Sequence, residues 1–137
     1  MNKTSLYVPV YSLTLILSAV LLFSVQPMFS KMILPLLGGT SQVWNTSMLF
    51  FQLCLLAGYA YAHGTTKLLS AKLQAIIHVC LVTAFIISLP FGVDASLEPP
   101  YNSDPTFWQI GLMLTTIGGP FFLVSATAPM LQSWFTH

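Results

Sequence analysis

Residues 7–28 of the chain read YVPVYSLTLILSAVLLFSVQPM, a segment without one charged side chain. About 20 apolar residues in an α-helix, each adding about 1.5 Å, are enough to cross a hydrocarbon layer of about 30 Å. Backbone amides inside lipid have no water to bond, so a segment of this kind is expected to be helical. Its apolar residues are continuous and do not alternate with polar ones, which argues against membrane β-strands. The sequence therefore predicts a membrane-spanning helix here.

Three further segments have the same character, at about residues 43–63, 73–93 and 106–130. Of the 137 residues, 55% are hydrophobic and only 5% are charged, and the mean hydropathy is +0.81. Soluble domains carry about a quarter charged residues, so water cannot be the main solvent of this chain. We expect one all-α membrane domain, residues 1–137, with four transmembrane helices in a lipid bilayer.

The connecting segments differ in composition. Residues 29–42 are too apolar for a free loop and too short to span, and Pro35 with Gly38-Gly39 predicts a turn, so a short interfacial or re-entrant segment is expected. Residues 64–72 are expected to form a loop, and residues 94–105 form a loop that holds all three acidic residues. A kink is expected at Pro120. The first span is too long for a secretory signal, and no small-x-small cleavage site closes it, so we expect it to be retained.

The distribution of lysines predicts the orientation. With four spans, Lys3, Lys67 and Lys72 lie on the same side as the C-terminus, and Lys31 alone lies on the other. Lysine and arginine concentrate on the cytoplasmic side of membrane proteins. Both termini are therefore expected in the cytoplasm.

Catalytic and cofactor motifs are missing from the sequence. His63, His78 and His137 have no metal-ligand spacing, either among themselves or with Cys54 and Cys80, and the two cysteines are interpreted as small core residues. No Gly-rich cofactor turn, phosphate loop or nucleophile motif appears, and no basic patch would bind nucleic acid. We expect no catalytic residue, no cofactor and no metal, and hence no enzyme.

Polar side chains inside the spans are the informative set, because lipid makes them costly and they usually face protein or a cavity. They either line a substrate path or make interhelical hydrogen bonds and snorkelling contacts, worth under about 1 kcal/mol each. We favour packing, and we expect further membrane helices or self-association to shield these groups. Gln26, Lys31 and Asn45 are also expected to converge beside the Pro35-Gly38-Gly39 segment, on the side of the membrane that holds the acidic loop. The candidates are Gln26, Lys31, Asn45, Gln52, His63 and His78.

Two groups of motifs in the sequence are distinctive. They are VQPMFSKMILPLLGG (25–39), VWN (43–45), FFQ (50–52) and GYAYAH (58–63) in the first group and SATAPMLQSWF (125–135) in the second. Together they resemble a known family, the amino-terminal membrane region of bacterial fused transporter-like/spermidine-synthase-like proteins. The resemblance implies a membrane region similar to the major facilitator superfamily, located in the bacterial cytoplasmic (inner) membrane. It also implies a cytosolic polyamine-synthase-like domain or subunit as a partner.

The resemblance also has a limit. The catalytic domain of that family has no counterpart here, so the chain looks like a truncated or split member and no catalytic residue can be carried over. The implied function is a non-catalytic, transporter-like module, and the alternative is an anchor or scaffold that positions a cytosolic synthase-like partner without transport. The motifs SVQPM (24–28) and SATAPM (125–130) echo one another, as an inverted half-repeat of that superfamily would require.

Overall fold

The computed structural model describes residues 3–87, 98–99 and 104–136, and the regular elements of these residues are all helical. The predicted all-α class is thus confirmed. In chain order the helices are α1 (Lys3–Ile33), α2 (Ser41–Leu68), α3 (Ala71–Ile87), α4 (Pro105–Met113) and α5 (Gly119–Thr136). A π-helical turn, Leu114–Gly118, joins α4 to α5.

Three of the four expected spans are present as helices long and apolar enough to cross a membrane: Tyr7–Leu37, Ser41–Leu68 and Pro105–Thr136. The third expected span, 73–93, is represented by α3, whose 17 residues are about 25 Å long. Residues 88–93 lie outside the described part of the chain. Most of the acidic loop lies outside it as well, and only Glu98, Pro99 and Asp104 of that loop are described before α4 begins at Pro105.

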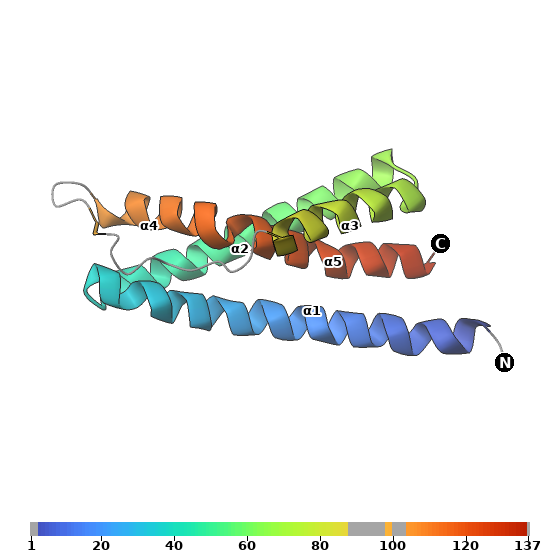
Figure 1. The fold of residues 1–137 in the computed structure, drawn as a ribbon, viewed down its shortest axis with the longest axis horizontal. Helices are drawn as coiled ribbons and strands as arrows, with labels where there is room; N and C mark the ends of the chain where they lie inside the picture. The colour runs from blue at the N-terminus through green and yellow to red at the C-terminus, as the bar shows by residue number, and fades with distance from the viewer. Residues whose placement is uncertain (1–2, 88–97, 100–103, 137) are drawn as a thin grey trace.

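The long helices lie side by side, and α5 is the central one, because it packs against α1, α2 and α3 (Figure 1). Successive passes reverse direction, so the start of α1 and the end of α5 lie at the same end of the bundle. The rings of Tyr11 and Phe135 are in contact there, with centroids 5.3 Å apart. This is the arrangement that four alternating passes require; the compartment of the termini stays a prediction.

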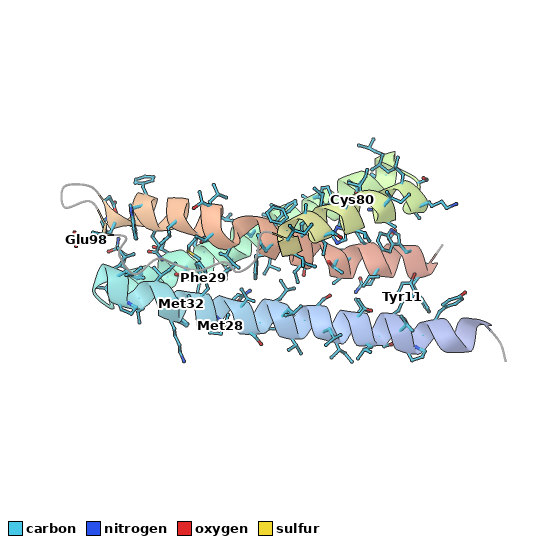
Figure 2. All side chains as sticks on the ribbon, in the orientation of Figure 1. Tyr11, Met28, Phe29, Met32, Cys80 and Glu98 are labelled. Atoms are coloured by element: carbon cyan, nitrogen blue, oxygen red, sulfur yellow. The ribbon has the colours of Figure 1, made fainter. Side chains whose placement is uncertain are left out.

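The buried core is small, and the outer surface is apolar. Phe51 of α2 and Phe121 of α5 meet with ring centroids 4.7 Å apart at the centre of the main hydrophobic cluster. Phe29 is buried in the same cluster, whereas Met28 on the same helix is 58% exposed (Figure 2). Phe23 is 75% exposed, and most other large apolar side chains of α1 are also exposed, but less so. Such a surface suits contact with lipid and not with water.

The segment expected to be interfacial, residues 29–42, is shorter than predicted. Its first residues extend α1 to Ile33, and a single 3₁₀ turn, Leu34–Leu37, follows. The predicted turn at the two glycines is confirmed: Gly38 and Gly39 have φ angles of 77° and 69°, a region that other residues enter only with strain. The amide of Gly39 closes the turn on the carbonyl of Leu34 at 2.9 Å.

One other boundary prediction was wrong in detail. The expected loop at residues 64–72 is mostly helical, and α2 runs to Leu68, because the hydroxyls of Thr65 and Thr66 bond back to carbonyls of the preceding turn. The irregularity expected at Pro120 appears as the π-helical turn just before it. Proline has no amide proton, so the carbonyl one turn upstream loses its partner and the helix widens there.

Candidate functional site

The six polar residues singled out from the sequence lie on three helices, and half of them lie on α2. Gln26 is half-buried and Lys31 exposed on α1, and His78 is buried on α3. Asn45, Gln52 and His63 are all exposed on α2. The structure therefore gathers three of the candidates on one helix, with their side chains turned away from the core.

The exposed polar residues of α2 share one narrow face. Seven and eleven residues separate Asn45, Gln52 and His63, which at about 100° per residue places them within about 20° of arc. Leu49, Leu56 and Tyr59 complete this face, with exposed fractions of 53%, 66% and 50%. We call these six residues, Asn45, Leu49, Gln52, Leu56, Tyr59 and His63, the α2 stripe.

No side-chain hydrogen bond joins the polar members of the α2 stripe to any residue that the structure describes. The buried residues Ser47, Phe51, Gly58 and Ala62 lie on the opposite side of α2, where α4 and α5 pack. Gln52 lies within one turn of the middle of α2, the position farthest from either end of the helix. A polar amide at mid-helix is thus presented to whatever surrounds the bundle.

A buried glutamine that the sequence reasoning missed joins α4 to α2. The side chain of Gln109 is 1% exposed, and its Nε2 donates to the Val43 carbonyl and to Ser47 Oγ, both at 2.8 Å. Both contacts lie near the start of α2. Gln109 therefore has a structural role in holding these two helices together.

A second missed glutamine joins three helices at the other end of α2. Gln74 of α3 is 1% exposed, and its Nε2 donates to Thr65 Oγ1 at 2.7 Å and to Thr66 Oγ1 at 3.2 Å. Its Oε1 accepts a hydrogen bond from Trp134 Nε1 of α5 at 2.7 Å. Both ends of the amide are in use, so this group holds the helices and offers nothing free to a ligand.

His78 makes a further interhelical polar contact. Its Nε2 lies 3.0 Å from Thr127 Oγ1 of α5, and the Thr127 hydroxyl can also donate to the Leu123 carbonyl at 2.9 Å. Which of the two groups donates in this contact depends on the tautomer of the imidazole ring. Its Nδ1 is buried without a hydrogen-bond partner among the described residues.

Both missed glutamines meet the criterion that selected the six candidates, because each is a polar residue inside an expected span. They lie close to the starts of the spans at 73–93 and 106–130, where polar residues are usually assigned to the interface. The criterion applied to whole spans would have found them. Their partners Ser47, Thr65 and Trp134 come from distant segments and have no signal of their own in the sequence.

The two cysteines lie in different surroundings. Cys54 is half-buried against the main hydrophobic cluster, as expected, but Cys80 is exposed on α3 and is not a core residue (Figure 2). Both thiols are free. No group of three or more His, Cys, Asp or Glu residues that could hold a metal ion is found in the described part of the chain.

The expected convergence of Gln26, Lys31 and Asn45 beside the Pro35-Gly38-Gly39 segment stays a prediction, and Asp94 of the acidic loop lies outside the described residues. Asp104 is the best defined of the acids: it caps α4, accepting a hydrogen bond from the Thr106 amide at 2.9 Å. That amide, together with the Thr106 hydroxyl, holds the pKa of the Asp104 carboxyl below its ordinary value. Gln42 Nε2 in turn donates to Thr106 Oγ1 at 3.1 Å and links the starts of α2 and α4.

One apolar cavity of about 360 Å³ lies between α1, α3 and the start of α5. All the side chains that line it are apolar, so it contains no group that could orient a polar solute. The lining residues are Leu21, Val25, Val82, Phe85, Ile86, Ile117, Pro120, Leu123 and Val124. The α2 stripe, in contrast, presents amide and imidazole groups that have no side-chain hydrogen bond to the described residues.

Comparison with protein-family models, with curated proteins and with solved structures gave no match to this chain.

Proposed function

We propose that the chain is a multi-span, transporter-like module of a fused or split spermidine-synthase-like protein in the bacterial inner membrane, with both termini in the cytoplasm and no catalytic activity of its own. The observation that carries the proposal is the set of free polar side chains on the α2 stripe. The motif resemblance through residues 25–63 and 125–135 supports the family, and the three long apolar helices support the membrane location.

The energetics of a polar group in lipid explain why this face matters. An amide moved into hydrocarbon without a hydrogen-bond partner costs several kcal/mol, about 4–8 on the cyclohexane scale. Gln52 is exposed near the middle of α2 and has no partner in the described part of the chain. A helix that carries such a residue is expected to face water or protein there, as the wall of a solute path does.

A non-transporting scaffold is the second candidate, and a different observation favours it. The buried polar groups Gln74, Gln109 and His78 all make interhelical hydrogen bonds, and the one cavity of about 360 Å³ is wholly apolar. A bundle held in this way suits an anchor that positions a cytosolic synthase-like partner. The two candidates differ in one property, which is whether water reaches the α2 stripe.

Thiol accessibility separates the two functions. In a background with Cys54→Ala and Cys80→Ala, Gln52→Cys is treated in sealed membrane vesicles with a charged, membrane-impermeant thiol reagent. Transport predicts that Gln52→Cys reacts faster than Phe23→Cys, a control that is 75% exposed on α1 and faces lipid. Equal, slow reaction at both positions would reject a water-filled path and leave the scaffold.

The absence of catalysis is tested separately. The purified chain is incubated with decarboxylated S-adenosylmethionine and putrescine, and spermidine formation is measured. We expect none above background, because no acidic catalytic pair and no Gly-rich cofactor turn appear in the sequence. Turnover that persists after removal of contaminating enzymes would refute this part of the proposal.

A further inference from the structure

The residues of the α2 stripe follow a regular spacing. Asn45, Leu49, Gln52, Leu56, Tyr59 and His63 are separated by alternating intervals of four and three residues, so the pattern repeats every seven residues, or 3.5 residues per position. That period is the signature of two helices that wrap around each other with a left-handed twist, because it keeps the same face turned toward the partner. All six residues are exposed, so no helix of the described bundle occupies this seam.

Lipid alone satisfies only part of this seam. Acyl chains match Leu49 and Leu56, but they leave the amides of Asn45 and Gln52 without donors or acceptors. An apolar partner helix would have the same defect. The seam therefore calls for a partner that places hydrogen-bonding groups at the same depths and apolar groups between them.

α2 itself has that pattern of groups. Two copies of the chain enter the membrane with the same orientation, so an axis normal to the membrane relates them and places each residue of α2 opposite its own counterpart. A primary amide both donates and accepts, and it is therefore complementary to a second copy of itself. Asn45 and Gln52 each meet this requirement at their own depth.

We propose that two copies of this chain pair in parallel along the α2 stripe, with the Gln52 amides of the two copies hydrogen-bonded across the axis. Leu49 and Leu56 pack between the amide layers, and Asn45 repeats the amide contact two turns away. The pair goes beyond the proposed function, although both use the same face of α2, and it does not require that a solute crosses the membrane.

Cross-linking tests the geometry of the seam. In the background that lacks Cys54 and Cys80, Leu56→Cys places two thiols opposite each other, within the short Cβ separation that a disulfide needs. Ala57→Cys is the matched control, since Ala57 is exposed at the same depth but lies about 100° around the helix. Mild oxidation in membranes is expected to give covalent dimers of Leu56→Cys and few of Ala57→Cys.

The contribution of the amide is measured in the same membranes. Energy transfer between donor- and acceptor-labelled copies, followed as the protein is diluted with lipid, gives the dimerisation constant. Gln52→Leu is expected to weaken dimerisation roughly 5- to 30-fold, the range for a lost interhelical hydrogen bond in a membrane, and Gln52→Asn should retain most of it. Gln52 is exposed and unbonded within the described bundle, so these substitutions leave the fold of the single chain intact.

The outcomes distinguish this inference from the proposed function. Dimers at Leu56→Cys together with slow thiol labelling at Gln52→Cys would support the dimer along the α2 stripe and refute the water-filled solute path. Rapid labelling at Gln52→Cys without dimers at Leu56→Cys would support the solute path and refute the dimer. Equal cross-linking at Leu56→Cys and Ala57→Cys, a wild-type chain that stays monomeric at high protein-to-lipid ratio, or cross-linking to a different membrane protein would each overturn the pair.

Discussion

The contact between α2 and α5 depends on Gly58, and the substitution Gly58→Ala tests it. A Cβ atom at this position would run into Ser125 Oγ, and it would lie 3.0 Å from the Phe122 carbonyl oxygen and 3.1 Å from Ser125 Cβ. Ser125 cannot move aside freely, because it is buried and its hydroxyl donates to the Phe122 carbonyl at 2.7 Å. The added methyl group must therefore push the two helices apart.

The cost of this change follows from three contributions. Overpacking costs roughly 1–3 kcal/mol, and loss of the Ser125 hydrogen bond adds about 0.6 kcal/mol. Alanine gains up to about 1 kcal/mol over glycine in helix propensity. Gly58→Ala is therefore expected to lower the free energy of unfolding by roughly 0.6–3.6 kcal/mol.

Reversible unfolding in mixed micelles of mild detergent and dodecyl sulfate measures this difference. Gly64→Ala is the matched control on the same helix, because a Cβ there meets nothing within 4 Å, and it should stabilise the protein by up to about 1 kcal/mol. Ser125→Gly combined with Gly58→Ala should recover part of the loss, since it removes two of the three contacting atoms. If Gly58→Ala is as stable as Gly64→Ala, the close approach of α2 and α5 at this point is refuted.

Three further predictions concern the polar groups and the turn. Gln74→Met should cost about 1–2 kcal/mol in the same unfolding assay by leaving the Trp134 indole N–H unpaired, and adding Trp134→Phe should recover part of it. The folded-state pKa of Asp104 is depressed, so its cap stabilises α4 above the carboxyl's unfolded pKa and is lost as the pH falls through the folded one. The protection factor of the Thr106 amide, which is its exchange rate corrected for the intrinsic effect of pH, should therefore fall on acidification in the wild type, and Asp104→Asn should remove that dependence on pH. Gly38→Ala should lower the free energy of unfolding by about 1–2 kcal/mol. The cause is backbone strain at a φ of 77°, since an added Cβ would meet no atom within 4 Å, and Gly38→Asn should cost less.

The helical class could be predicted from the sequence, because length and apolar composition alone decide whether a segment can cross a membrane. The ends of the helices were harder to place. Gly64, Thr65 and Thr66 have the composition of a loop, yet the threonine hydroxyls bond to the preceding turn and to Gln74, and α2 continues. That outcome depends on a contact with α3 that no local pattern contains.

The site was predictable only in part, for a related reason. The spacing of Asn45, Gln52 and His63 places them on one face of a helix, but it does not say whether that face is buried. The side that α2 buries is set by its close approach to α5 at Gly58 and by the Gln109 contact from α4. His78 likewise finds its partner Thr127 on a distant helix, so its bonded state could not be read from its own surroundings in the sequence.

The packing of α1 has a consequence for how the protein is made. α1 rests mainly on α5, and the ring contact of Tyr11 with Phe135 joins the first helix to the last turns of the chain. During synthesis, α1 therefore enters the bilayer long before its principal neighbour exists, and it must persist there as a solitary helix. The apolar side chains that α1 exposes, such as Phe23, allow it to remain in the lipid without a partner helix. α2, in contrast, exposes the polar side chain of Gln52. Of these helices, it is therefore the one that a partner present early in synthesis would stabilise most.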